Sequence, residues 1–348
     1  MAAGAVAAPV RGVQAVRRPG MFYRDPISCL QSTLGTLVIE HGHDPLEALG
    51  AGWEFRYLPG QVRTEEFYYP CRYPDDLARS VAPHHPIRSA WHTAPGDEPL
   101  AVLADTIAAG GLPIAAVDNY HLPFRPAYHD VHAAHLVVVY GVDPGRGLVL
   151  VSDAMPPEYS GPIRAEDFLA AWDSANPTDE QDAFFSDAPI ARRYLNVEIG
   201  VPYPALDQAG LAAAVRANLA GFAAAADDAW CGLAGVARYA ALVRDAARDG
   251  DGRLVREVYP FGWGMQAQSC LHGELLRRQG ERWRLPALRE AGRRVEAVGY
   301  AWTGLRVTAA HTWPDPGAAA PSLARHATRL NDRYQAAVEA VAAAAERM

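Results

Sequence analysis

The chain contains no lysine, and all 32 of its basic side chains are arginines. This absence excludes chemistry that needs a lysine amine, such as Schiff-base formation, pyridoxal phosphate attachment, Ser-Lys dyads and the Walker A phosphate-binding loop. The sequence also has no G-x-S-x-G elbow, and no G-x-G-x-x-G loop follows an expected strand. It therefore indicates neither a serine hydrolase with that elbow nor a dinucleotide-binding fold.

Cysteine is scarce and widely spaced. The four cysteines are Cys29, Cys71, Cys231 and Cys270, and no two form a C-x-x-C pair. Zinc-ribbon and dithiol redox motifs are therefore absent, and a disulfide framework is not indicated. Each cysteine could be a small buried apolar residue, and one of them could be a nucleophile.

An excess of positive charge and a long apolar run are also missing. The net charge of −8 argues against a nucleic-acid-binding protein. No apolar run approaches the roughly 18 residues that a membrane span needs. Residues 1–20 are rich in Ala and Val with their arginines late, whereas a secretory signal begins with its positive charge. We expect a disordered tail over residues 1–20 and a cytoplasmic protein.

The pattern of apolar residues predicts two domains of different class. In residues 21–203 it predicts a mixed α+β domain, with helices near 29–38, 99–109 and 165–172 and strands at 113–118, 136–140, 148–152 and 191–199. Residues 57–96, rich in Pro, Tyr and His, predict an irregular loop. Residues 204–348 predict an all-helical domain, with helices in 205–248, 263–280, 285–312 and 322–347 and a linker over 312–321.

The segment Asp25–Ser32 predicts a helix that begins at a cysteine. Pro26 and Ser28 are residues typical of a helix start, and Ser28 as N-cap would place Cys29 in the first turn. The positive end of a helix lowers the pKa of a thiol, and its unpaired backbone N–H groups can form part of an oxyanion hole. This local pattern favours a nucleophilic Cys29, but a buried structural cysteine remains the alternative.

A histidine and an aspartate flank the turn of a predicted hairpin. The turn signal Val142–Gly147 joins two strands, with His135 at the start of the first and Asp153 at the end of the second. Their numbering predicts that both side chains point to one face. A histidine oriented by a carboxylate is the general base that nucleophilic catalysis needs. The alternative is a histidine that caps a strand and an aspartate that opens a turn.

The order of these residues resembles that of the papain-like clan. The stretches DPISCLQSTLGTLV (25–38), GGLPIAAVDNYHLPFRPAYHD (110–130) and HAAHLVVVYGVDPGRGLVLVSDA (132–154) resemble the N-terminal domain of the butirosin biosynthesis protein H (BtrH) family. The segment PFGWGMQAQSCLHGELL (260–276) is similar to the helical domain often joined to it. The resemblance implies a papain-like fold. It also implies that Cys29 accepts the acyl group, His135 is the base and Asp153 orients the base.

The same resemblance implies the reaction and its partners. The enzyme would take an acyl or peptidyl group from a carrier-protein thioester and pass it to a small amine in natural-product assembly, by amide formation or cyclisation. The chain would need no cofactor of its own, because the partner carries the phosphopantetheine. Relatives often have His directly before the nucleophile, where this chain has Ser28.

Further residues are expected near this site. The helical domain could exclude water, with Trp263, Met265 and Gln266 as lining residues, although a buried helix start explains them as well. Asp118, Tyr120 and His121 follow a strand end and fit the family pattern, while a satisfied turn aspartate is equally compatible. We expect a substrate-binding role for Trp263, Gln266 and these three residues.

Several alternatives remain open at this point. A peptidase, amidase or thioesterase would use the same catalytic residues, and a non-catalytic binding protein could keep the same fold.

Histidines gather in one region together with an aspartate, at His121, His129, Asp130, His132 and His135. No H-E-x-x-H motif occurs, and His132 and His135 would face opposite ways on one strand. We therefore expect no metal site.

An arginine-rich segment offers a candidate docking surface. Residues 277–294 hold seven arginines against Glu281 and Glu290. On an acidic protein this positive stripe could bind an acidic carrier protein, and a solvated helix face is the alternative. The acyl group, the acceptor and the oligomeric state, including a homodimer, are not determined by the sequence.

Overall fold

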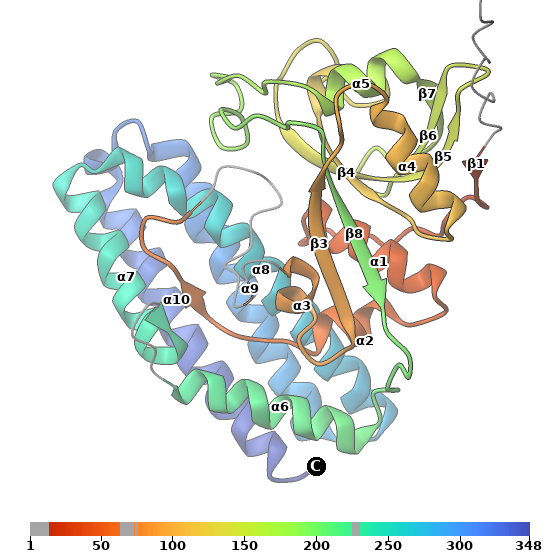
Figure 1. Ribbon diagram of the computed structural model, residues 1–348. Coiled ribbons are helices and arrows are strands. Elements are labelled where there is room, and N and C mark those ends of the chain that lie inside the picture. Colours follow the sequence, from red (N-terminus) through yellow and green to blue (C-terminus); the bar gives the residue numbers. More distant parts are fainter. Residues whose placement is uncertain (1–13, 63–72, 74–75, 225–229) are drawn as a thin grey trace, which may run out of the picture.

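The computed structural model describes residues 14–62, 73, 76–224 and 230–348. An antiparallel sheet and a layer of long helices lie side by side (Figure 1). The strands are β1 (Gln14–Ala15), β2 (Arg56–Tyr57), β3 (Ile87–Thr93), β4 (Ile114–Asp118), β5 (Ala134–Asp143), β6 (Leu148–Asp153), β7 (Tyr159–Arg164), β8 (Arg193–Ile199) and β9 (Trp230–Cys231). The helices are α1 (Cys29–Glu40), α2 (Pro45–Gly50), α3 (Leu77–Val81), α4 (Pro99–Ala108), η1 (Asn119–His121), α5 (Ala165–Trp172), α6 (Gln208–Ala223), α7 (Gly232–Asp249), α8 (Gly252–Arg282), α9 (Pro286–Thr312) and α10 (Pro316–Ala345).

The main sheet has the strand order β3-β8-β4-β5-β6-β7, and β1 also pairs with β5. Every residue of β4 and β5 is buried. These two strands lie in the middle of the sheet, and α1 and α4 contact β5 while α5 contacts β4. Burial on both faces explains why their sequences read as nearly continuous apolar runs instead of alternating ones.

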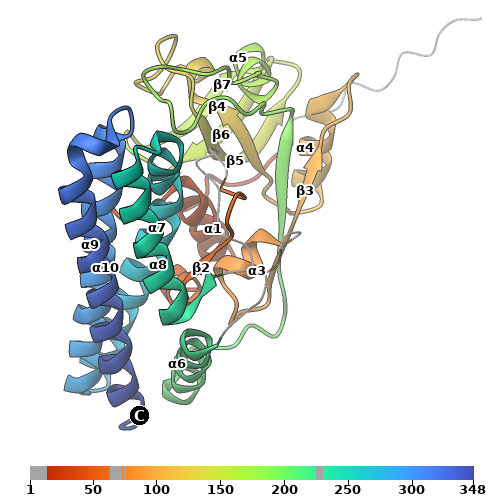
Figure 2. The ribbon, with the colours of Figure 1, turned by 90° about the vertical axis from the view of Figure 1, so that its left-hand side faces the viewer.

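The helical layer is built around α8, which contacts α2, α7 and α9, while α10 packs against α6, α7 and α9 (Figure 2). A segment from the first part of the chain enters its core. Phe55 lies against Tyr239 and Trp302, and Trp53 lies against Phe222. Strand β2 pairs with β9 in the same region. Residues far apart in the sequence therefore share one core, and the domain boundary near residue 204 stays a prediction.

The mixed α+β class of the first part and the helical class of the second are confirmed. The prediction of an irregular loop over residues 57–96 was wrong where α3 and β3 form. The carboxylate of Asp76 accepts hydrogen bonds from Arg79 N (3.1 Å) and Ser89 N (2.8 Å), so one side chain caps α3 and holds β3 beside it. Residues 63–72, 74 and 75 lie outside the described residues.

Two further predictions need correction. The expected linker 312–321 is largely helical, because Asp315 caps α10 and Pro316 occupies its first turn, where proline is tolerated. The expected tail 1–20 includes Gln14 and Ala15, which pair with β5, whereas residues 1–13 lie outside the described residues. Within the described part of the chain, every helix is too short or too polar to span a membrane.

Candidate active site

Cys29 is the first residue of α1, as the sequence predicts, and Ser28 is its N-cap. Ser28 has an extended backbone, and its carbonyl accepts the first helical hydrogen bond, from Ser32 N (3.1 Å). Gln31 Oε1 accepts hydrogen bonds from both the backbone N (3.1 Å) and the hydroxyl (2.5 Å) of Ser28. These contacts hold the start of the helix in place and therefore fix the position of Cys29.

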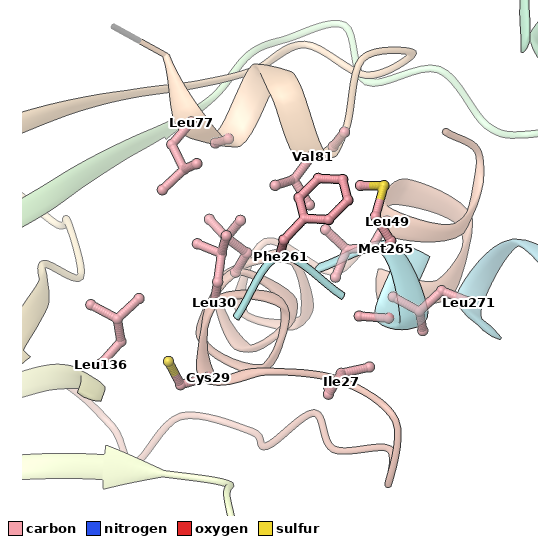
Figure 3. Packing of buried hydrophobic residues seen from close by; sticks show 14 of the residues in the cluster. Ile27, Cys29, Leu30, Leu49, Leu77, Val81, Leu136, Phe261, Met265 and Leu271 are labelled. Carbon is pink, nitrogen blue, oxygen red and sulfur yellow. The ribbon is translucent and has the colours of Figure 1, made fainter. Parts of the chain in front are cut away.

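The side chain of Cys29 lies in an apolar environment and has no exposed surface. Figure 3 shows Leu30 and Leu136 near it, with Phe261 and Met265 of α8 beyond Leu30. Such surroundings disfavour a charged thiolate unless an opposite charge lies close by. The helix start and a neighbouring histidine supply positive charge at this position.

His135 and Asp153 lie side by side, with 2.8 Å between His135 Nε2 and Asp153 Oδ2. Both residues are buried, and the imidazole also forms a hydrogen bond with the side chain of Cys29. Because Nε2 faces Asp153, Nδ1 is the ring nitrogen left for Cys29. The structure thus brings the three predicted residues together as a chain of thiol, imidazole and carboxylate.

A β-bulge puts His135 and Asp153 on the same face of the sheet. The hairpin starts with Asp143 opposite Leu148, and this register alone would leave the two side chains on opposite faces. A register shift between Val139 and Gly141 changes the pairing by one residue. The prediction of a shared face is therefore confirmed, but it depends on a bulge that the sequence analysis did not identify.

The pKa of His135 is raised well above its ordinary value. Burial lowers this pKa, but the charge of Asp153 and the hydrogen bonds with Asp153 and Cys29 outweigh both burial and the charge of Arg125. The imidazole therefore favours its protonated form. A protonated histidine beside a thiol at a helix start favours a thiolate–imidazolium pair.

Arg125 is a residue of this site that the sequence analysis missed. Its Nη1 lies 3.3 Å from Asp153 Oδ2 and also donates to the carbonyls of Met155 (3.2 Å) and Pro156 (3.3 Å). The other oxygen of Asp153 accepts a hydrogen bond from Met155 N (2.9 Å). Arg125 thus helps to keep the carboxylate in place. It lies within the quoted stretch 110–130, but no local signal links it to Asp153.

Asp118 ends β4, and its neighbour Val117 pairs with His135 across the sheet. The Asp118 carboxylate is fully buried and accepts four hydrogen bonds, from the backbone of Tyr120 and Ala133 and from the side chains of His132 and Ser174. The hydrogen bonds that Asp118 accepts therefore all come from neighbouring segments of the chain. This arrangement fits a positioning residue better than a group that binds substrate directly.

The remaining predicted residues after β4 form an aromatic cluster. Tyr120 stacks on His132 with ring centroids 4.1 Å apart, and His121 lies edge-on to Tyr120. Burial lowers the pKa of His121.

Across the described part of the chain, no three His, Cys, Asp or Glu side chains are placed to hold a metal ion. In the histidine-rich region, the bonding partner of His132 is Asp118.

Gln266 connects the helical layer to the loop before Cys29. Its Nε2 donates to Pro26 O (3.2 Å), and its Oε1 accepts from Thr303 Oγ1 (2.8 Å) and Arg306 Nε (2.9 Å). It therefore holds the approach to α1 against α8 and α9. Met265 is fully buried, whereas Trp263 lines a cavity between α8, α9 and the loops of the α+β part.

The other described cysteines lie in different environments. Burial, with the nearby charges of Glu296 and Glu274, raises the pKa of Cys270 to about 12. Cys231 is the N-cap residue of α7, and Arg56 Nη1 lies 3.6 Å from its sulfur. Cys71 lies outside the described residues. A thiol with a pKa near 12 is almost entirely protonated at neutral pH, so Cys270 is poorly suited to act as a nucleophile.

The arginine-rich segment is partly neutralised. Four of its seven arginines form ion pairs, in the pairs Arg277–Glu296 (3.1 Å), Arg278–Asp44 (2.7 Å), Arg293–Glu290 (3.4 Å) and Arg294–Glu290 (3.0 Å). The positive stripe predicted for residues 277–294 is therefore weaker than the sequence alone suggests.

Comparison with known families gives one match in this part of the chain. Residues 28–154 match the family described as butirosin biosynthesis protein H, N-terminal. The matched region begins just before Cys29 and ends just after Asp153, so it contains all three residues of the thiol–imidazole–carboxylate chain. Comparison with curated proteins gave no match.

Proposed function

We propose that this chain is a cysteine-dependent acyltransferase of natural-product biosynthesis, and the match of residues 28–154 to the butirosin biosynthesis protein H family supports this proposal. It would take an acyl or peptidyl group from a carrier-protein thioester and pass it to a small amine in the cytoplasm. The observation that carries the proposal is the hydrogen-bonded chain from Cys29 through His135 to Asp153.

In the first step, the Cys29 thiolate attacks the carbonyl carbon of the thioester. Backbone N–H groups at the start of α1 stabilise the negative oxygen that develops. The bond between this carbon and the carrier sulfur then breaks, and the imidazolium of His135 gives its proton to the departing thiolate. The products are an acyl-Cys29 thioester, a neutral His135 and the free carrier thiol.

In the second step, the amine attacks the acyl-Cys29 carbonyl, and the neutral His135 takes a proton from the amine nitrogen. The bond between the acyl carbon and Sγ breaks, which releases the amide and restores the thiolate–imidazolium pair. Asp153 keeps the imidazole in the required orientation throughout and stabilises its positive charge. Overall, a thioester and an amine are converted into an amide and a free thiol.

The burial of Cys29 supports acyl transfer over hydrolysis. The thiol has no exposed surface, and α8 lies close to the start of α1. An acyl-enzyme in such surroundings would be shielded from bulk water, which competes with the amine. The same three residues would serve a peptidase, an amidase or a thioesterase, so hydrolysis is the alternative outcome to be tested.

The partner would be an acyl or peptidyl carrier protein that brings its own phosphopantetheine, so that the enzyme needs no cofactor. Within the stripe 277–294, Arg282, Arg284 and Arg289 are the arginines outside the four ion pairs described above. They are candidates for contact with an acidic carrier surface.

Intact-mass measurement of the protein after incubation with an acyl-carrier thioester tests the proposal. We expect a mass increase equal to the acyl group, located on Cys29, and release of this group as an amide when an amine is added. The variant Cys29→Ala should acquire no adduct, and the matched control Cys270→Ala should acquire it at the wild-type rate. Absence of an adduct on the wild-type protein would contradict the proposal, and rapid loss to free acid would favour hydrolysis.

A further inference from the structure

The three residues of the proposed active site are closed to solvent. Cys29 and His135 have no exposed surface, and 1% of the surface of Asp153 is exposed. A thioester that arrives on a carrier protein cannot reach a thiol in this state. The proposed reaction therefore needs a movement that opens a path to Cys29.

The connection between α5 and β8 contains a compact loop over residues 176–187. Figure 1 shows this connection extending from the α+β part towards the helical layer. The two ends of the loop meet, because Asp187 N donates a hydrogen bond to Asn176 O (2.8 Å). Within the loop, Asp179 N donates to Ser186 Oγ (2.8 Å). A loop of this length with joined ends is an Ω-loop, a class that is frequently functional.

One side of this Ω-loop lies against the start of β5, the strand that carries His135. Ala134 N donates a hydrogen bond to Phe185 O (2.9 Å), so the loop backbone is bonded to the residue next to His135. The Asp179 carboxylate accepts a second hydrogen bond, from His132 N (2.9 Å). The Ω-loop therefore covers the end of the strand at which the imidazole lies.

The other side of the Ω-loop contacts α8 through two aromatic rings. Phe184 lies 4.6 Å from Tyr259, and Phe185 lies 5.4 Å from Trp263, between ring centroids. Both contacts are between side chains, so breaking them costs no backbone hydrogen bond. The Ω-loop thus connects the α+β part to the helical layer beside the proposed active site.

A cavity of about 450 Å³ lies behind the Ω-loop. Phe184 and Phe185 form part of its wall, and Arg125 forms another part. Arg125 Nη1 lies 3.3 Å from Asp153 Oδ2, so this side chain both lines the cavity and contacts the active-site carboxylate. Movement of the Ω-loop away from α8 would widen this space next to the active site.

The backbone at both ends of the Ω-loop is in the left-handed region. The φ angles are 41° at Asn176 and 85° at Asp187, and Ala191 (56°) and Arg192 (51°) follow just before β8. Residues other than glycine rarely adopt this region, and Asn and Asp tolerate it best. Such backbone is concentrated at switch regions, and the hinges of lids lie at loop ends that absorb a change in φ and ψ. The two ends of the loop are therefore suited to act as hinges.

We propose that residues 176–187 form a lid that closes over Cys29 and opens to admit the substrates. The inference rests on the proposed function for the identity of what enters, but not for the movement itself. In the closed state, Phe184 and Phe185 pack on α8 and help to keep water from the site. In the open state, the loop turns about Asn176 and Asp187 and its rings leave α8.

The rate at which a bulky maleimide alkylates Cys29 measures the opening of the lid. The variant Phe184→Ala removes one ring contact with α8 and keeps the hydrogen bond from Ala134 to Phe185. From the contribution of one aromatic pair, we expect this variant to react about three- to tenfold faster than wild type. The conservative variant Phe184→Tyr keeps the ring and should react at the wild-type rate.

His43→Ala is the matched control, because it also removes a ring that stacks between two segments, with His43 and Tyr203 at 3.6 Å between ring centroids. His43 follows the far end of α1, about 18 Å along the helix from Cys29. This variant should leave the alkylation rate of Cys29 unchanged.

Cys270 in the same protein distinguishes local opening from unfolding. It lies within α8, so its alkylation should stay at the wild-type level in Phe184→Ala. A faster reaction confined to Cys29 would support the lid. Equal rates in wild type and Phe184→Ala, or a parallel increase at Cys29 and Cys270, would overturn the inference. Failure of the proposed function is seen separately, as the absence of an acyl adduct on Cys29, because alkylation needs no acyl substrate.

Discussion

Two cysteines and two histidines of the described residues lie in decisively different environments. Cys29 and His135 share a hydrogen bond, whereas Cys270 and His272 are two residues apart in one helix and do not face each other. Cys29 and His135 lie where α1 begins beside β5, whereas Cys270 and His272 both lie within α8. The pKa of His135 is raised well above its ordinary value. Burial instead lowers the pKa of His272 to about 4, even though its Nδ1 donates a hydrogen bond to Gly50 O (2.7 Å), which raises this pKa.

Burial favours the neutral form of both side chains in α8. Together with the nearby charges of Glu296 and Glu274 it raises the pKa of Cys270 to about 12, and it lowers that of His272 to about 4, so neither side chain is charged at neutral pH. His135 is also fully buried, but the Asp153 carboxylate lies 2.8 Å away and reverses the effect. The comparison shows that a carboxylate bonded to the imidazole, and not the degree of burial, separates His135 from His272.

Removing that carboxylate should produce the largest effect. We expect Asp153→Asn to lower the rate of Cys29 acylation about 10³- to 10⁴-fold, because the imidazole loses both its orientation and the charge that stabilises its proton. The matched variant Glu296→Gln removes a carboxylate near Cys270 and should leave the rate unchanged. Rapid-quench mass spectrometry with an acyl thioester measures both rates.

Thermal unfolding of both variants serves as the control, since a misfolded protein would also lose activity. If folded Asp153→Asn were acylated at the wild-type rate, the difference between Cys29 and Cys270 would not depend on this carboxylate.

A smaller effect is expected in the alkylation of the two thiols. A thiolate paired with His135 should let Cys29 react with iodoacetamide below pH 7, whereas Cys270, with a pKa of about 12, should remain almost unlabelled. In His135→Ala the thiol loses its partner, and an ordinary thiol pKa of about 8.5 predicts labelling roughly 100-fold slower at pH 6.5. Peptide mapping of the labelled protein over a range of pH distinguishes the sites, and equal labelling of Cys29 and Cys270 would contradict the comparison.

Local sequence signals were sufficient to predict the main elements that carry Cys29 and His135. Pro26 and Ser28 mark a helix that begins at Cys29, and the turn signal Val142–Gly147 marks the hairpin that carries His135. These signals lie within a few residues of the features they define. The α+β and helical classes followed from apolar spacing over longer segments in the same way.

The missed features depend on contacts between residues far apart in the sequence. Arg125 reaches Asp153 only in the folded chain. Gln266 was expected near the site, but its hydrogen bond from α8 to the carbonyl of Pro26 was not predicted. The bulge between Val139 and Gly141 has no strong local signal, although it decides which face His135 occupies. Long-range packing determines these features, and a single sequence contains no direct record of it.

The two histidines should also have opposite effects on stability as the pH changes. The raised pKa of His135 contributes stability that is present below its unfolded value of about 6.5 and is lost as the pH rises through the folded pKa. The lowered pKa of His272 contributes stability that is present above pH 6.5 and is lost as the pH falls towards about 4. Protonation of His135 therefore stabilises the folded protein, whereas protonation of His272 destabilises it.

Substitution of His272 tests the smallest of the expected effects, a loss of unfolding free energy at acidic pH. Between pH 8 and pH 5, the protonation of this residue in the unfolded chain should remove about 2 kcal/mol from the free energy of unfolding. In His272→Gln this loss should be absent, while the contribution of His85, whose pKa burial also lowers to about 4, remains in both proteins. Urea unfolding at several pH values measures the difference. If wild type and His272→Gln lost the same free energy on acidification, the buried histidine of α8 would not be held neutral, and burial alone would not explain the contrast with His135.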